Sequence, residues 1–222
     1  MTDGSLSPVR ENASVEECGA VLAAAFAREP ATRWICGDST AVRERWFAAT
    51  LATQATLPGA RRTVLTDAPQ RPPASAPVQA PAPAPAAIPA PAPLAAAVLT
   101  PPGAEPSARA SATWSLATLR HCGPRPLLRT LRYLHATEPQ APPGAWTLEF
   151  LGVAPGARGR GAGGRLLTHT VDTVPARDGI FLTTADPANE PFYEYFGFGV
   201  LARTRLGGLT VTAMWRPGRG SG

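Results

Sequence analysis

Hydrophobic residues follow two different periodicities along this 222-residue chain. Within residues 14–28 they recur every three or four positions, which predicts a helix. Ser14 and Glu17 have the spacing of a capping box at its start, and Pro30 is expected to end it. The same pattern predicts further helices at residues 40–57, 107–120 and 125–137.

The last third of the chain alternates between strand-like and helix-like segments. The predicted elements are a strand at 146–153, a glycine-rich stretch and helix at 159–173, a buried strand at 179–184, a short helix at 190–196, and a hairpin of 200–205 with 209–215. This order of strand, helix, strand, helix and hairpin predicts a mixed sheet covered by helices, in the α/β (α+β) class.

The excess of proline is concentrated in residues 69–93, which are almost entirely proline and alanine. Alternating Pro-Ala cannot pair in a sheet and favours an extended polyproline conformation. Because short strands are predicted on both sides, at 62–66 and 94–100, the tract is interpreted as the overgrown loop of a hairpin. We therefore expect one domain over residues 1–222 with a low-complexity insertion, although a docking ligand for a partner is an alternative.

Composition excludes several kinds of chemistry. All 21 basic residues are arginine, so no mechanism can use a lysine nucleophile, and a net charge of +5 suits an anionic cofactor. The arginines are spread along the chain without interleaved aromatics, so no nucleic acid is expected as a partner. Three scattered cysteines without a CxxC pair argue against a metal site or a disulfide framework. No apolar leader or long apolar run is seen, so we expect no membrane association and a cytoplasmic location.

The segment of residues 151–164 carries the clearest chemical signal. A strand ends at Val153, Pro155 breaks it, and a glycine-rich turn leads directly into a helix. Glycines let backbone N–H groups converge, and the positive end of a helix attracts anions, so the turn is suited to a pyrophosphate. Residues 159–164 also match the G-x-G-x-x-G pattern of a dinucleotide-binding fold, but no βαβ repeat precedes them. A phosphate-binding P-loop would require a lysine, which the chain lacks.

Two motifs in this region resemble those of the GNAT acyltransferase superfamily. Residues 158–163 resemble its Q/R-x-x-G-x-G/A signature, preceded by the L-x-V-x-P of residues 151–155, and residues 189–198 resemble N-x-x-F-Y-x-x-x-G-F. Residues 22–33 further resemble the puromycin N-acetyltransferase-like branch. The resemblance implies a mixed, mostly antiparallel sheet flanked by helices and splayed to admit acetyl-CoA or another acyl-CoA.

The resemblance also assigns roles to individual residues. Backbone groups of the fourth strand would pair with the pantetheine arm, the glycine-rich turn would hold the pyrophosphate, and an asparagine would contact the cofactor near its pantetheine. The cofactor-binding residues so implied are Leu151, Gly152, Val153, Arg158, Gly159, Arg160, Gly161, Ala162, Gly163 and Asn189.

Two residues are expected to move protons. By the resemblance Tyr193 would protonate the leaving thiolate, although an aromatic residue in a short amphipathic helix can also be simple core. Glu149 is the candidate general base, because a strand would place it on one face with Leu151 and Val153, and a carboxylate there is costly unless paired or functional. An edge salt bridge with an arginine is the alternative for Glu149.

The expected function is transfer of an acetyl group to a primary amine of a small molecule or peptide-like metabolite, with antibiotic modification as one setting. The alternatives are peptide or protein N-acetylation and a catalytically silent CoA-binding module. Arg33 and Trp34 follow the first helix, where this superfamily commonly shapes acceptor specificity, and Glu190 stands where the family often has a small or apolar residue. Cys122 beside His121 is not expected to form a catalytic dyad, because adjacent helical residues point about 100° apart.

Overall fold

The computed structural model describes residues 8–67, 92–137, 140–175 and 177–218. Within these described residues the chain forms seven strands and seven α-helices. In order they are β1 (Arg10–Glu11), α1 (Val15–Ala25), α2 (Pro30–Cys36), α3 (Thr40–Gln54), β2 (Arg61–Thr66), β3 (Pro93–Thr100), α4 (Ala108–Cys122), α5 (Pro124–Thr137), β4 (Trp146–Val153), the 3-10 turn η2 (Pro155–Ala157), α6 (Ala162–Thr173), β5 (Ile180–Thr184), the 3-10 turn η3 (Pro187–Asn189), α7 (Glu190–Tyr195), β6 (Gly199–Leu206) and β7 (Leu209–Arg216).

The strands form one sheet in the order β1-β2-β3-β4-β5-β7-β6. Only β4 and β5 run parallel, and every other neighbouring pair is antiparallel. The expected mixed, mostly antiparallel sheet of the α/β (α+β) class is therefore confirmed.

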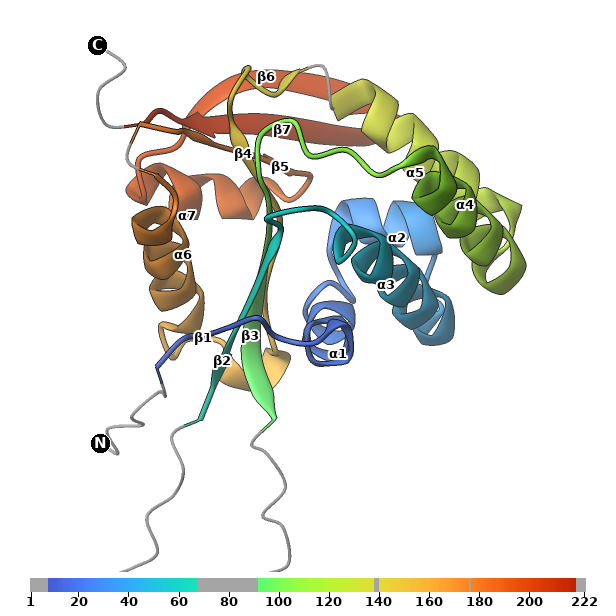
Figure 1. The fold of residues 1–222 in the computed structure, drawn as a ribbon, viewed down its shortest axis with the longest axis horizontal. Coiled ribbons are helices and arrows are strands. Elements are labelled where there is room, and N and C mark those ends of the chain that lie inside the picture. Colours follow the sequence, from blue (N-terminus) through green and yellow to red (C-terminus); the bar gives the residue numbers. More distant parts are fainter. Residues whose placement is uncertain (1–7, 68–91, 138–139, 176, 219–222) are drawn as a thin grey trace, which may run out of the picture.

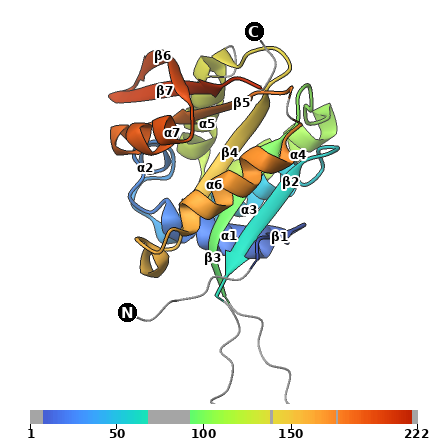
Figure 2. The same cartoon turned by 90° about the vertical axis from the view of Figure 1, so that its left-hand side faces the viewer.

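Helices cover both faces of this sheet. Figure 1 shows α6 and α7 on one side and α1 to α5 on the other, and Figure 2 shows α6 lying across the sheet. Two main hydrophobic clusters result. One packs Leu166 and Leu167 of α6 against the sheet, and the other packs Leu22 and Phe47 of α1 and α3 against it.

The start of the chain confirms one local prediction and corrects another. Ser14 caps α1, and Glu17 completes the capping box as predicted. Pro30, however, does not end α1, because that helix has already ended at Ala25, and instead it is the first residue of α2. Proline is favoured at a first helical position, since the missing N–H would have no partner inside the helix. The sequence analysis overlooked α2 and the two-residue strand β1.

The strands on either side of the proline-alanine tract pair with each other as predicted. Arg61 lies opposite Leu99 and Thr66 opposite Pro93, so β2 and β3 form an antiparallel hairpin. Pro93, assigned to the tract, begins β3. Residues 69–91 of the tract lie outside the described residues, and the role of the tract as a passive insertion in a single domain stays a prediction.

The packing of α1 on β4 depends on Gly152. A Cβ atom there would lie 2.9 Å from both Ala25 Cβ and Leu22 Cδ2, and 3.1 Å from Phe26 Cε2. Because these atoms belong to a helix held in the core, the helix would have to shift to make room. We expect Gly152→Ala to lower the free energy of unfolding by about 1–3 kcal/mol, measured by urea denaturation.

Gly156 provides a matched control on the same chain segment. A Cβ atom there meets no atom within 4 Å, so Gly156→Ala should leave stability unchanged or slightly raised. Equal destabilisation by the two substitutions would contradict the close approach of α1 and β4.

Candidate functional site

The sheet opens between β4 and β5. The two strands pair over only three residues each, with Trp146 opposite Ile180 and Leu148 opposite Leu182. Beyond Leu148, β4 continues to Val153 along β3, whereas β5 continues along β7. Within the described part of the chain, no strand covers the β5-facing edge of β4 after Leu148, so backbone groups of residues 149–153 on this edge can accept an added extended chain.

A β-bulge at Glu149 marks the point where β4 leaves β5. Phe150 lies opposite Val98 and Leu148 opposite Leu99, so Glu149 is an extra residue in β4. Such bulges bend a strand and are frequent beside active sites.

The bulge also corrects the expected orientation of Glu149. Leu148 belongs to the hydrophobic cluster on the α6 side, and Leu151 and Val153 pack against the same cluster. The two residues between Leu148 and Leu151, Glu149 and Phe150, therefore lie on the other face, where Phe150 joins the α1 and α3 cluster. Glu149 does not share a face with Leu151 and Val153, because the bulge interrupts the strict alternation that the sequence argument assumed.

The glycine-rich turn after β4 has the open geometry expected of an anion site. Gly159 and Gly161 have φ values of 76° and 74°, and a Cβ atom at either would meet nothing within 4 Å. Gly161 is the N-cap of α6 and supplies no side-chain hydrogen bond to the first turn of that helix. The first N–H groups of α6 are thus left for an external acceptor at the positive end of the helix, which fits a phosphate group.

The two arginines of this turn make contacts within the protein. Arg158 donates from Nη2 to the carbonyl oxygen of Ala25 at 3.1 Å, which fixes the turn to the end of α1. Arg160 forms an ion pair with Asp67, just after β2. Contacts of these two arginines with a pyrophosphate remain predictions. The positive charge of Arg160 is partly neutralised by its ion pair with Asp67.

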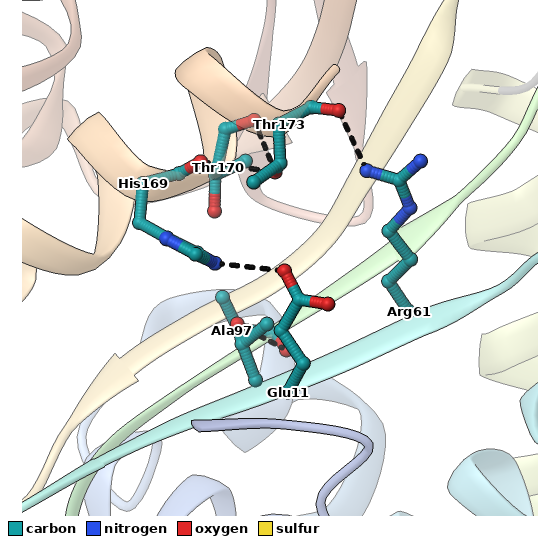
Figure 3. A network of polar contacts seen from close by, with 7 residues as sticks. Glu11, Arg61, Ala97, His169, Thr170 and Thr173 are labelled. Carbon is teal, nitrogen blue, oxygen red and sulfur yellow. Dashed lines mark hydrogen bonds and ion pairs between the residues drawn. The ribbon is translucent and has the colours of Figure 1, made fainter. Parts of the chain in front are cut away.

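A polar network holds α6 against the sheet edge (Figure 3). His169 Nε2 lies 3.2 Å from Glu11 Oε1 of β1, and Arg61 of β2 donates to the carbonyl oxygen of Thr173 at 2.7 Å. The Arg61 guanidinium also lies over the Trp146 ring, 4.5 Å from its centroid. The helix that follows the glycine-rich turn is therefore fixed to β1 and β2, and Arg61 connects this network to β4.

On the other side of the opening, hydrogen bonds order the turn from β5 to α7. Asn189 donates from Nδ2 to Thr184 Oγ1 at 3.3 Å, and Asp186 Oδ1 accepts from the N–H of Ala188 at 3.0 Å. Glu190 pairs with Arg203 of β6 and accepts from Thr212 of β7, and these hydrogen bonds hold the pKa of its carboxyl below the ordinary value. The unusual glutamate beside Asn189 thus anchors α7 to the C-terminal hairpin.

Tyr193 lies on α7 and is 9% exposed. Its ring packs on Phe192 and Phe198, with centroids 5.3 and 5.8 Å away. Among the described residues its hydroxyl has no hydrogen-bond partner, and burial, followed by the charge of Glu29, raises its pKa well above the ordinary value. The phenol therefore stays protonated and can act only as a proton donor at neutral pH.

Two residues near this tyrosine were missed by the sequence analysis. Glu29 caps α2, with its carboxylate oxygens accepting from the N–H groups of Ala31 at 3.1 Å and Thr32 at 2.6 Å. Tyr133 of α5 shares a hydrogen bond of 2.9 Å with Thr183 of β5, and burial and the charges of Glu29 and Glu149 raise its pKa. An acidic residue directly before Pro30 was the available signal for Glu29, but Tyr133 had none, because it comes from a distant helix.

The candidate acceptor residues on α2 lie in different surroundings. Trp34 lies against Gly207 in the β6–β7 turn, and Arg129 of α5 stacks on its ring and donates to its carbonyl oxygen. Arg33 is exposed and paired with Asp38 at 2.7 Å, so it faces solvent. Neither has a contact with Tyr193 in the described structure, and their part in acceptor binding stays a prediction.

The cysteines lie away from the opening between the strands. Cys36 and Cys122 line a cavity of about 230 Å³ between α2, α3 and α5, and Cys18 is buried in the core. Burial raises the pKa of Cys18 to about 11 and that of Cys36 to about 12, and it raises the pKa of Cys122 as well. These thiols are protonated at neutral pH and therefore poor nucleophiles.

No helix of the described residues is both long enough and apolar enough to cross a membrane. No group of three or more histidine, cysteine or acidic side chains in the same residues has the arrangement of a metal site.

Comparison with known proteins agrees with this geometry. Residues 128–198, which run from α5 through the glycine-rich turn to the end of α7, match the model of the acetyltransferase (GNAT) family. No curated protein matches the whole sequence significantly.

Solved acetyltransferase structures share the fold. A structure from Corynebacterium glutamicum, described as "histone acetyltransferase HPA2 and related acetyltransferase", superposes on this chain with a TM-score of 0.64. The two sequences are 19% identical, and the alignment covers 95% of each chain. An acetyltransferase from Thermus thermophilus superposes with a TM-score of 0.51 at 15% identity, and the alignment covers 94% of this chain and 96% of that one. A polyamine N-acetyltransferase of Drosophila melanogaster that forms N-acetylagmatine gives 0.51 at 14%, covering 96% and 100%. At these identities the likeness concerns the fold.

The anion site at α6 can be tested with Gly161→Val. A β-branched residue is strained at a φ of 74°, and its side chain would fill the open space where the pyrophosphate is expected. We expect acetyl-CoA binding, measured by calorimetry, to be lost while the protein still folds.

Gly103→Val is the matched control, because Gly103 has a φ of 68°, an equally open Cβ position, and a place in the loop after β3. It should carry the same backbone strain and keep the affinity for acetyl-CoA. Unchanged affinity in the Gly161 variant would rule out this turn as the binding site.

Proposed function

We propose that this chain is an acetyltransferase of the GNAT superfamily and that it acetylates a primary amine of a small molecule with acetyl-CoA as the donor; the fold and the match over residues 128–198 support the proposal. The observation that carries the proposal is the opening between β4 and β5, with an unpaired strand edge on one side and a buried, protonated phenol on the other. The remaining steps follow from what each side chain can do at that opening.

The cofactor would lie along the open edge of β4. Its pantetheine arm would pair with backbone groups of Leu151 to Val153, as an added strand does, and its pyrophosphate would bind the N–H groups at residues 158–163. Asn189, held by Thr184 at the end of β5, would contact the arm from the other side. In this arrangement the thioester would lie near Tyr193 of α7.

Tyr193 would act as the general acid. When the amine attacks the thioester carbonyl, the carbon–sulfur bond breaks and the thiolate needs a proton. Burial that raises the pKa of the phenol also raises that of a thiol in the same place, so the two remain matched for transfer. The free hydroxyl of Tyr193 is consistent with a partner supplied by the substrate.

Glu149 is proposed as the general base, directly or through an ordered water. The bulge places its side chain at the branching point of the strands, on the face toward α5, and its charge reaches Tyr133. An amine must lose a proton to complete acyl transfer, and a carboxylate beside the reacting centre can accept it.

A peptide or protein amine remains the alternative acceptor, and a silent CoA-binding module the alternative to an enzyme. The polyamine acetyltransferase of Drosophila and the resemblance of residues 22–33 to the puromycin branch both favour a small amine. A screen of small amines, including puromycin, for thiol release from acetyl-CoA tests this choice, and it also tests antibiotic modification. A cytoplasmic location belongs to the same proposal.

The role of Tyr193 is tested with Tyr193→Phe. The substitution keeps the ring contacts with Phe192 and Phe198 and removes only the hydroxyl, so we expect kcat to fall by about 10²–10⁴-fold with little change in the KM for acetyl-CoA. Steady-state kinetics with a thiol reagent gives both values, and an unchanged kcat would exclude Tyr193 as the acid.

The role of Glu149 is tested with Glu149→Gln. A base must be unprotonated, so wild-type activity should decline as the pH falls through the pKa of this carboxyl, and the variant should lack that acidic limb and have a lower kcat. Cys122→Ala is the control and should be silent, because Cys122 is a half-buried thiol with a raised pKa. Loss of activity in the Cys122 variant with retention in Tyr193→Phe would indicate an acyl-cysteine intermediate instead.

A further inference from the structure

Three segments that are distant in sequence meet beside the opening between β4 and β5. Ala31 of α2, Ala185 after β5 and Val211 of β7 form a small buried cluster, with Tyr133 of α5 packed against it. Glu29 precedes Ala31 by two residues and Asp186 follows Ala185, so the cluster brings these two carboxylates to the same place. Their charges interact, since Asp186 contributes to raising the pKa of Glu29.

Among the described residues, neither carboxylate forms an ion pair with a cationic side chain. Ion pairs among the described residues involve other acidic groups, namely those of Arg10 with Glu17, Arg33 with Asp38, Arg160 with Asp67, His169 with Glu11, Arg177 with Asp178, and Arg203 with Glu190. The chain has 21 arginines, yet these two half-buried carboxylates lie together with no arginine paired to either of them in the described structure. Burying like charges side by side is unfavourable unless something outside the chain compensates it.

Both carboxylates are also fixed in orientation. Glu29 accepts from two N–H groups at the start of α2, and Asp186 accepts from the N–H of Ala188 at the start of η3. Each oxygen keeps capacity for a further donor. A prearranged pair of acceptors loses little entropy when it binds a cation.

A third group points to a ligand at this place. Tyr193 is more than nine-tenths buried, its hydroxyl has no partner among the described residues, and it lies within electrostatic reach of Glu29. Tyr193 belongs to α7 and Glu29 caps α2, and Figure 1 shows these two helices on opposite sides of the sheet. The acetyl transfer proposed above would take place at Tyr193, beside this carboxylate pair.

We propose that Glu29 and Asp186 form an anionic subsite that binds a second positive charge of the acceptor while its primary amine is acetylated. The substrate class would then be a short dication, such as an α,ω-diamine or an aminoalkylguanidine. This inference rests on the proposed function for its chemistry, but the subsite itself is a matter of binding and can be measured separately.

The test compares 1,4-diaminobutane with n-butylamine, which have the same chain length but differ by one charge. Calorimetry on the full chain saturated with CoA should show the diamine binding at least about tenfold more tightly. Asp186→Asn keeps the Oδ1 that caps η3, and Glu29→Gln keeps one of the two oxygens that cap α2. Each substitution should remove most of this advantage while leaving butylamine binding within about threefold. Melting temperatures check that the variants fold.

Glu44→Gln is the control, because it removes one exposed negative charge on α3 away from the cluster. It should leave diamine binding unchanged. A wild-type protein with no preference for the diamine, or equal weakening by Glu44→Gln, would overturn the subsite. So would a Glu29→Gln variant in which turnover of both amines falls equally at unchanged KM, because that pattern identifies a general base.

Thiol release from acetyl-CoA distinguishes failure of the subsite from failure of the proposed function. If the protein acetylates both amines equally well, the proposed function is supported and the subsite is contradicted. If the protein releases no thiol with any amine, yet binds the diamine through Glu29, the subsite is supported and the proposed function is contradicted.

Discussion

The separation of β4 from β5 is the constraint on which the candidate site depends. Parallel strands that paired along their full length would bury every backbone group, and no ligand could enter the sheet. Here the pairing ends at Leu148, and the bulge at Glu149 bends β4 away at the next residue. One extra residue in one strand thus creates both the free edge for an extended ligand and the position of a carboxylate at the branching point.

The elements around this opening are held by contacts that leave little freedom. Gly152 lets α1 approach β4, Arg158 ties the glycine-rich turn to Ala25, and the network of Glu11, Arg61 and His169 fixes α6. On the other side, Glu190 connects α7 to β6 and β7. The proposed acetyl transfer would need a thioester, an amine and two proton-transfer groups within bonding distance, and such rigid support favours that arrangement.

Sequence alone was sufficient for most elements and for the glycine-rich turn before α6. The hydrophobic periodicity predicted β4 with its observed bounds, and the glycines between Pro155 and α6 predicted the turn, because both signals are local. Local reasoning failed at Pro30, which can end one helix or begin another, and at Glu149, where a bulge reversed the expected face. A bulge is set by pairing with β3, so it has no mark within β4 itself.

The carboxylate pair of Glu29 and Asp186 illustrates the same limit more strongly. The two residues are separated by more than 150 positions, and the buried cluster that contains Ala31 and Ala185 brings their segments together. Tyr133 joins them from a third segment. No spacing rule connects such residues, whereas Arg158 to Gly163 are consecutive and could be identified as a motif.

The central claim is that the open edge of β4 and the turn before α6 together bind acetyl-CoA. Hydrogen–deuterium exchange with and without CoA tests it most directly, because it reports which backbone amides become protected. The account predicts new protection in residues 149–153 and 158–165, with no change in α4. Protection confined to α4 and α5, or none in β4 despite measured binding, would contradict it.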